Sequence, residues 1–314
     1  MTADALWCIG SNEARIRPGA MGEGILIRTV FSGISRGTER LVLSGRVPAS
    51  EHDRMRAPHQ QGDFPFPVKY GYAAVGMVDE GTMKGSLVFA LYPHQTVFRL
   101  PEDGLIPLPA GLPAERAVLA ANMETALNIL WDSGAGAGDS VAIIGGGLVG
   151  LLVASLAARL PGSWVTVIDP LPQREEPARS LGCNFATPPD APMDQDVVIH
   201  ASATEAGLNL AIRIAGLQST ITEASWHGEG DISLSLGGAF HSRRLRIVSS
   251  QVGAIPPDRA PRWTYRRRMN MALELLLDNR LEILISGETR FADLADAYPA
   301  ILADPDTLCH RIRF

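Results

Sequence analysis

A glycine-rich stretch near the middle of the chain has the residue types and the spacing to hold a dinucleotide. Gly145, Gly147 and Gly150 form a G-x-G-x-x-G pattern directly after the apolar run VAII and before an apolar, helix-like run. In such a loop the first glycine permits a tight turn, the second lets the backbone approach a pyrophosphate, and the third lets the helix pack on the strand. The helix N-terminus then offers free N–H groups to the phosphates. We therefore expect Leu148 and Val149 to join the three glycines in binding the cofactor.

An acidic residue at the end of the next apolar run indicates which dinucleotide binds. Asp169 closes the run VTVID and lies about 20 positions after the second glycine, as expected for a carboxylate that accepts hydrogen bonds from the adenosine ribose. Its charge would repel a 2′-phosphate, so the sequence favours NAD over NADP. Arg174 follows shortly after and weakens that preference, so NADP stays possible.

Residues that commonly bind metals are too scattered along the chain to predict a metal site. Cys8, Cys183 and Cys309 form no CxxC pair, which excludes a disulfide framework and a four-cysteine zinc site, and we expect buried, reduced thiols. His52 and His59 share one polar loop and are interpreted as a solvated pair. The remaining histidines are interpreted as ordinary polar residues: His94, His200, His227, His241 and His310.

Composition and charge narrow the class of protein. The 314 residues are 46% hydrophobic and 20% charged, which is typical of a globular chain of about two domains. A net charge of −6 argues against a nucleic-acid partner. The densest basic cluster, Arg262 with Arg266–Arg268, is interpreted as a solvated helix face. We expect no signal peptide, no membrane span at 141–160, where glycines interrupt the apolar run, and a cytoplasmic location.

The pattern of predicted secondary structure changes near residue 112. Before it, short β-like runs alternate with turns. After it, strand-like and helix-like runs alternate, which predicts a doubly wound parallel sheet. Residues 46–67 are predicted to be a long loop. The strands are expected at 24–31, 72–78, 87–91, 141–145, 165–169, 196–202, 219–225, 245–253 and 309–314, and the helices at 117–134, 148–160, 174–182, 205–215, 265–285 and 291–302.

This order of parts resembles the medium-chain dehydrogenase/reductase superfamily, the zinc alcohol dehydrogenase fold, over nearly the whole chain. The matching stretches are SGISRGTE, the Gly-Tyr pair followed by AAVGMV, METALN and the glycine loop. The resemblance implies an α/β fold with a GroES-like β-rich catalytic domain at 1–120, completed by 254–314, and a Rossmann domain at 121–253. A weaker similarity, in SGISRGTERLVLSGR and YGYAAVG, is to the bacteriochlorophyllide dehydrogenase-like branch.

The chain departs from this family where zinc is bound. The stretch GICGTD of zinc members corresponds to GISRGTE, with Ser35 or Arg36 in place of the cysteine. The stretch GHE corresponds to Gly-Tyr-Ala around Tyr72, and the last ligand position falls on Ala121. Because zinc needs cysteine, histidine or carboxylate ligands, we expect a protein without zinc.

The resemblance places hydroxyl groups where the metal would polarise the substrate. Tyr72 is the expected proton donor, assisted by Ser35 and Thr38, although Tyr72 equally well fills the space that the metal vacates. Glu124 lies on an apolar helix, where a carboxylate either faces a cleft as a second candidate acid or requires a buried partner.

Polar residues after the expected strands complete the predicted cofactor site. Ser202, Thr204 and Ser250 follow strand-like runs, and ligands bind at the carboxyl ends of strands in such sheets. We expect these three side chains to contact the dinucleotide. The resemblance further implies a homodimer, in which an edge strand at 219–225 or 245–253 would pair across the two chains.

These features predict a zinc-independent oxidoreductase. It would transfer a hydride between NAD(H) and a small carbonyl, alcohol or activated alkene. Three alternatives stay open: a non-catalytic nucleotide-binding protein, an NADPH-dependent quinone or enone reductase, and a methyltransferase-like Rossmann enzyme.

Overall fold

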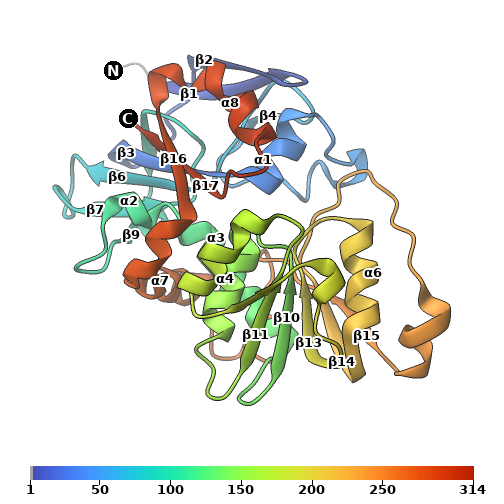
Figure 1. Cartoon of the computed structure of the whole chain (residues 1–314). Coiled ribbons are helices and arrows are strands. Elements are labelled where there is room, and N and C mark those ends of the chain that lie inside the picture. The colour runs from blue at the N-terminus through green and yellow to red at the C-terminus, as the bar shows by residue number, and fades with distance from the viewer. Residues whose placement is uncertain (1–2) are drawn as a thin grey trace. The chain divides into compact units, whose positions relative to one another are not determined.

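The computed structural model describes residues 3–314, which form two compact units (Figure 1). The first unit runs to Ala121 and resumes at Leu273, and the second comprises Asn122–Ala272. Residues 254–272, which we expected in the first domain, lie in the second unit. The cause is local, because Arg268 in this segment is anchored by groups of the second unit, described below.

The first unit is rich in β-structure, as predicted, and its C-terminal strand completes its main sheet. β3 (Ile25–Ser35) pairs with β6 (Ala74–Val78), β8 (Val97–Leu100) and β17 (Cys309–Arg313). The strand order is β16-β17-β3-β6-β7-β9, and a smaller sheet has the order β2-β1-β5-β4. The other elements are β1 (Asp4–Gly10), β2 (Glu13–Pro18), β4 (Gln61–Gly62), β5 (Val68–Lys69), β7 (Leu87–Ala90), β9 (Ile106–Pro107), β16 (Ile285–Arg290), α1 (Arg36–Leu43), α2 (Ala114–Ala117) and α8 (Leu294–Ala303).

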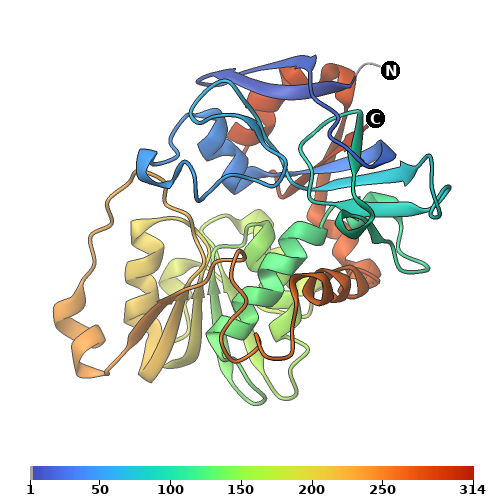
Figure 2. The ribbon, with the colours of Figure 1, turned by 180° about the vertical axis from the view of Figure 1, so that it is seen from behind.

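The second unit contains the predicted doubly wound sheet. Its six parallel strands have the order β12-β11-β10-β13-β14-β15 and lie side by side in both views (Figure 1 and Figure 2). The order reverses between β10 and β13, where Rossmann sheets bind their ligands. The bounds are β10 (Ser140–Ile144), β11 (Trp164–Ile168), β12 (Asn184–Ala186), β13 (Gln195–His200), β14 (Ala215–Glu223), β15 (Arg246–Ser249), α3 (Ala120–Ser133), α4 (Leu148–Ala157), α5 (Glu175–Ser180), α6 (Glu205–Ile214) and α7 (Tyr265–Leu275).

The structure corrects one predicted helix and selects between the two segments offered as an edge strand. The helix expected over 265–285 ends at Leu275, and β16 begins at Ile285. A short 3-10 turn separates them because the Asp278 side chain accepts the N–H of Arg280 and starts a new turn. Of the two segments offered as an edge strand, 219–225 belongs to β14, which lies between β13 and β15, and 245–253 contains β15. The edge position is that of β15.

Buried apolar side chains hold the second sheet against its helices. Ile144, Val198 and Ile221 come from three neighbouring strands and pack with Leu208 and Ile212 of α6. Because both faces of this sheet are covered, its strands read as continuous apolar runs. This explains why the sequence predicts them well.

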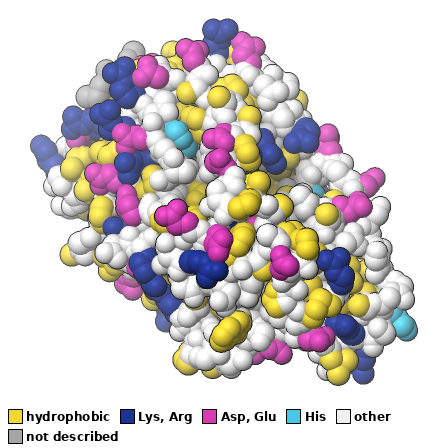
Figure 3. Space-filling model, viewed as in Figure 1, with side chains coloured by type: hydrophobic (Ala, Val, Ile, Leu, Met, Phe, Trp, Pro, Cys, Tyr) yellow, Lys and Arg dark blue, Asp and Glu magenta, His cyan; other side chains and the backbone are white. Residues whose placement is uncertain are grey.

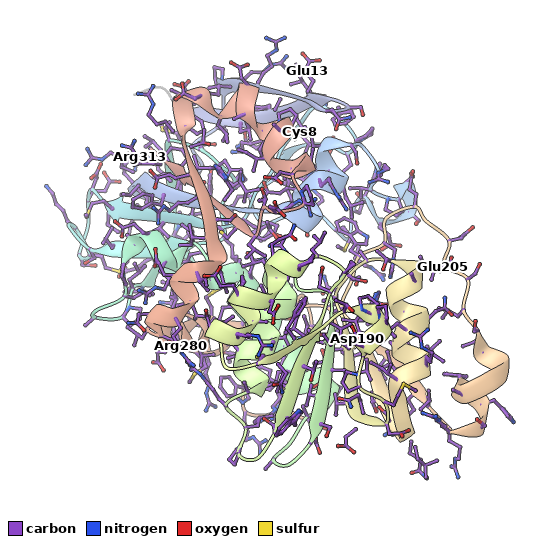
Figure 4. All side chains as sticks on the ribbon, viewed as in Figure 1. Cys8, Glu13, Asp190, Glu205, Arg280 and Arg313 are labelled. Atoms are coloured by element: carbon purple, nitrogen blue, oxygen red, sulfur yellow. The ribbon has the colours of Figure 1, made fainter. Side chains whose placement is uncertain are left out.

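The cysteines, the segment 46–67 and the surface charges complete the description of the fold. Cys8, labelled in Figure 4, is buried, as are Cys183 and Cys309, and none of the three forms a disulfide, as predicted. Residues 46–67 include a short 3-10 turn at Ala49–Glu51 and strand β4. On the face in Figure 3, basic and acidic side chains are interspersed. Within residues 3–314 every helix is too short or too polar to cross a membrane.

Candidate functional site

The glycine loop lies at the reversal of strand order in the second unit. It follows β10 directly, and Gly147 caps the N-terminus of α4. A Cβ on Gly147 would meet no atom within 4 Å, which leaves open space where a pyrophosphate would approach. A Cβ on Gly150 would lie 1.9 Å from the carbonyl oxygen of Gly145, so this position requires glycine for close packing of helix and strand. Leu148 is buried in the first turn of α4 and Val149 is partly buried.

Asp169 follows β11 and is tied to this loop. Its Oδ2 accepts the N–H of Gly146 at 2.7 Å, and its Oδ1 accepts the N–H of Leu171 at 2.9 Å. A carboxylate has about four lone-pair sites, so it can accept further hydrogen bonds from a ribose. Arg174 is buried and lies close to Asp169 and the loop. A Cβ on Gly146 would lie 3.0 Å from the Arg174 Cβ and 3.3 Å from the Asp169 Cβ.

The parallel register brings a polar cluster together at the carboxyl ends of β13 and β14. His200 and Glu223 are register partners, and His200 Nδ1 lies 2.6 Å from Glu223 Oε2. The other ring nitrogen, Nε2, lies 2.7 Å from Ser202 Oγ, which lies 2.8 Å from Thr204 Oγ1. Burial opposes ionisation of Glu223, but hydrogen bonds and charge from His200 outweigh burial and lower the pKa of the carboxyl group.

The three predicted contact residues after the strands have different partners. Ser202 belongs to the cluster above. Thr204 caps α6 by accepting the N–H of Gly207 at 3.1 Å. The hydroxyl of Ser250 instead donates to Asp132 of α3 at 2.6 Å. The structure thus brings Ser202 and Thr204 together, whereas it holds Ser250 on a separate carboxylate.

Glu124 has the buried partner that the sequence left open. The Arg268 Nε donates to Glu124 Oε1 at 3.0 Å, and the same guanidinium bonds to Asn128 and to the Val252 carbonyl. Burial raises the pKa of Glu124, although the charge of Arg268 opposes that rise. Arg268 is 1% exposed, so the interpretation of its cluster as a solvated helix face was wrong for this residue. The structure therefore supplies the buried partner, which was one of the two alternatives for Glu124.

The hydroxyl groups predicted to replace the metal lie together in the first unit. Tyr72 hydrogen-bonds to the side chains of Ser35 and Thr38. Burial, followed by the nearby charge of Glu39, raises the pKa of Tyr72 to about 12. The phenol is protonated at neutral pH, as it is at its ordinary pKa, and so carries a proton that it can donate.

A buried network that the sequence did not reveal surrounds this group. Glu39 is fully buried and accepts three hydrogen bonds: from the Ser35 N–H at 2.7 Å, from His94 Nε2 at 3.0 Å and from the Tyr298 hydroxyl at 2.6 Å. The other nitrogen of His94 lies 2.8 Å from Ser32 Oγ. The only sequence signal was the position of Glu39 within GISRGTE, because His94 and Tyr298 are distant in the chain.

The positions that the family resemblance assigns to zinc ligands carry other side chains in this chain. Those positions present the hydroxyl groups of Tyr72 and Ser35, whereas zinc takes cysteine, histidine or carboxylate ligands. Among residues 3–314, the three His, Cys, Asp or Glu side chains whose ligand atoms lie together are His200, Glu223 and His227 of the second unit. The interpretation of His200 and His227 as scattered polar residues was wrong, because they lie in one group although α6 and β14 separate them along the chain.

Comparison with known proteins identifies the fold. No family model matches the chain. The chain is 27% identical over 205 residues to D-guloside 3-dehydrogenase of Escherichia coli, covering 61% of this chain and 59% of that protein. It therefore spans about three fifths of the length of this curated relative.

Two solved structures cover the whole chain. L-idonate 5-dehydrogenase of Escherichia coli has a TM-score of 0.82 at 14% identity and covers 100% of this chain and 99% of its own. A short chain alcohol dehydrogenase of Escherichia coli CFT073, complexed with NADH, has a TM-score of 0.77 at 15% identity, with 100% of both chains covered. The chain thus has the fold of the medium-chain alcohol dehydrogenases, a Rossmann domain joined to a GroES-like domain.

Proposed function

We propose that the protein is an oxidoreductase that uses NAD(H) and acts on a carbonyl or alcohol group of a polyol or sugar derivative. The observation that carries this proposal is the glycine loop, where Gly147 leaves open space beside the N-terminus of α4. The names of D-guloside 3-dehydrogenase and L-idonate 5-dehydrogenase support a hydroxyl-rich substrate. An activated alkene is a less supported substrate on this ground.

The glycine loop and its neighbours would hold the nicotinamide cofactor. Gly145, Gly147 and Gly150 with the first turn of α4 would bind the pyrophosphate, and Asp169 the adenosine ribose. Ser202 and Thr204 lie at the neighbouring strand end and would add hydroxyl contacts. When bound, the cofactor supplies or accepts the hydride.

The proton is assigned to Tyr72 rather than to a metal-bound oxygen. In the reducing direction, the alkoxide that forms on hydride addition takes the phenol proton, so the substrate becomes an alcohol and Tyr72 becomes a phenolate. The hydrogen-bonded hydroxyl groups of Ser35 and Thr38 stabilise that phenolate. Solvent protons then restore the phenol through these hydroxyl groups, and in the oxidising direction the same steps run in reverse.

A single substitution tests the cofactor site without disturbing the fold. Gly147→Val adds carbons to open space and has an allowed backbone, with φ −74° and ψ 178°. We expect NADH affinity, measured by fluorescence titration, to fall at least about 100-fold because the pyrophosphate loses its approach. Gly237→Ala, also at an open position, is the matched control and should bind normally. Unchanged NADH binding by Gly147→Val would refute the proposed cofactor site.

The proton donor is tested by Tyr72→Phe. We expect turnover of a reactive polyol to fall about 10²- to 10⁴-fold, with NADH binding unchanged. Tyr70→Phe is the control, because Tyr70 is a buried neighbour whose ring lies 6.0 Å from that of Tyr72. Full turnover by Tyr72→Phe would remove the donor role. A parallel NADPH titration decides whether Arg174 overrides Asp169 and shifts the function toward an NADPH-dependent reductase.

A further inference from the structure

A group of potential metal ligands lies in the second unit, whereas the hydroxyl groups assigned to proton transfer belong to the first. His200 is the last residue of β13, Glu223 is the last residue of β14, and His227 follows in the next loop. Their ligand atoms all lie within 4.8 Å of one another. Figure 4 labels Glu205, the first residue of α6, which begins shortly after His200. Two imidazoles and one carboxylate are a set that binds first-row divalent metal ions.

The carboxylate of Glu223 is oriented toward both imidazoles. Its Oε1 is anchored by the backbone N–H of Ser225 at 2.7 Å. Its Oε2 lies 2.6 Å from His200 Nδ1 and 3.5 Å from His227 Nε2. The hydrogen bond to Oε1 therefore fixes the orientation of the carboxylate, so that Oε2 points toward the two imidazoles.

His227 carries the independent observation that points to a ligand. Its Nε2 is buried from solvent and has no hydrogen-bond partner, and it lies 3.5 Å from Glu223 Oε2. A buried polar atom without a partner is costly and rare, and a missing ion is one of its explanations. The nitrogen is directed to the same oxygen that His200 contacts, so all three ligand atoms converge.

The surroundings of His200 fix which of its nitrogens is free for a metal. Its Nε2 lies 2.7 Å from Ser202 Oγ, and a ligating histidine commonly donates its second N–H to such an oxygen. A Cβ on Gly207 would lie 2.7 Å from Nε2 and 2.3 Å from Ser202 Oγ. Glycine at 207 therefore makes room for this contact, which leaves Nδ1 as the ligand atom.

We propose that His200, Glu223 and His227 form a binding site for a divalent transition-metal ion such as Zn²⁺. The ligands are His200 Nδ1, Glu223 Oε2 and His227 Nε2, with a fourth position for water or a ligand oxygen. Metal–ligand bonds of about 2.0–2.1 Å in a tetrahedron place neighbouring ligand atoms about 3.3 Å apart. The Glu223–His227 distance of 3.5 Å already matches this spacing. The Glu223–His200 distance of 2.6 Å opens by a small rotation of the carboxylate as the ion replaces the shared proton.

The site is tested by titrating untagged, chelator-treated full-length protein with Zn²⁺ in competition with a chromophoric chelator. We expect one ion per chain with micromolar or tighter affinity, and no binding of Mg²⁺ in the same range because two ligands are nitrogens. Co²⁺ should give the visible absorption of a tetrahedral complex. Neither readout needs a nicotinamide cofactor or turnover, so failure here is separate from failure of the proposed function.

Matched variants identify the ligands. His227→Ala and Glu223→Gln should each weaken Zn²⁺ binding at least about 100-fold, since each removes one of three ligands. His241→Ala changes an exposed histidine of the same unit and should bind as the unaltered protein does. His227 has no hydrogen bond to lose, so its variant should fold, which circular dichroism checks. Absence of stoichiometric Zn²⁺ binding, or unaltered binding by both variants, would overturn the site.

Discussion

Two histidine–carboxylate pairs, one in each unit, are built from the same groups. In the first unit, His94 lies 3.0 Å from Glu39 and its other nitrogen lies 2.8 Å from Ser32. In the second, His200 lies 2.6 Å from Glu223 and its other nitrogen lies 2.7 Å from Ser202. Each is a serine–histidine–carboxylate chain of side chains from different parts of one unit.

The two pairs differ in the hydrogen-bond partners and the exposure of their carboxylates. Glu39 has three donors and no exposed surface. The side chain of Glu223 is 15% exposed and shares one oxygen between two imidazoles, one of which has no hydrogen bond. A satisfied network stabilises a fold, whereas an incomplete one can accept a ligand. The same residue types therefore take a structural role in one unit and a binding role in the other.

The largest expected effect comes from removing the two carboxylates in turn. Glu39→Ala leaves three buried donors without an acceptor, and we expect a loss of about 3–5 kcal/mol in the free energy of unfolding. Glu223→Ala frees partly exposed groups and should cost about 1–2 kcal/mol. Chemical denaturation monitored by circular dichroism measures both. Equal losses would break the distinction between the two networks.

A second experiment tests whether other buried charges of the second unit lack partners as the Glu223 network does. The buried pair of Glu124 and Arg268 lies in that unit and is satisfied. Arg268→Met should cost about 3 kcal/mol by leaving Glu124 as an unpaired buried charge. The double variant with Glu124→Met should recover most of that loss, because no buried charge remains. If the double variant were less stable than Arg268→Met, the pair would not behave as a closed unit.

Stability at alkaline pH tests a buried charge of the first unit. Lys69 is fully buried and donates to Gln95 Oε1 at 2.6 Å. Burial lowers the pKa of Lys69 from 10.5 to about 8. Between pH 8 and 10.5 the unfolded chain thus binds more protons at this site, so the contribution of Lys69 to the free energy of unfolding rises with pH. Below pH 8 that contribution is constant.

The comparison of the unaltered protein with Lys69→Met isolates this contribution. Cys8, whose pKa burial raises to about 12, acts in the opposite direction above pH 9, and it does so equally in both proteins. We expect the difference in unfolding free energy to change by about 3 kcal/mol over this window. Parallel pH profiles would show that Lys69 is charged in the folded protein throughout.

The smallest expected effect concerns the histidine without a hydrogen bond. His227→Leu removes a buried polar atom that has no partner, so the metal-free protein should change by less than about 1 kcal/mol and can even gain stability. His94→Leu, the matched change in the first unit, breaks bonds to Ser32 and Glu39 and should cost several times more. Thermal unfolding compares the two. A large loss in His227→Leu would show that this nitrogen is engaged in the metal-free protein.

Local patterns were enough for the fold class and the cofactor loop. The spacing of Gly145, Gly147 and Gly150 after an apolar run predicts the strand, turn and helix, because the tight turn, the approach of a pyrophosphate and the packing of the helix on the strand each require a residue without a side chain. The group formed by Tyr72, Ser35 and Thr38 followed from the family resemblance, and the structure places these side chains in contact.

Other features depended on contacts between distant parts of the chain, which only the tertiary structure decides. Arg268 looked like a solvated residue until its partner Glu124 was placed beside it. His200 and His227 looked unrelated until the parallel register of β13 and β14 set His200 beside Glu223. Sequence patterns report local propensity and periodicity. The partner of a buried charge and the third ligand of a metal come from other elements, which only the tertiary structure brings close.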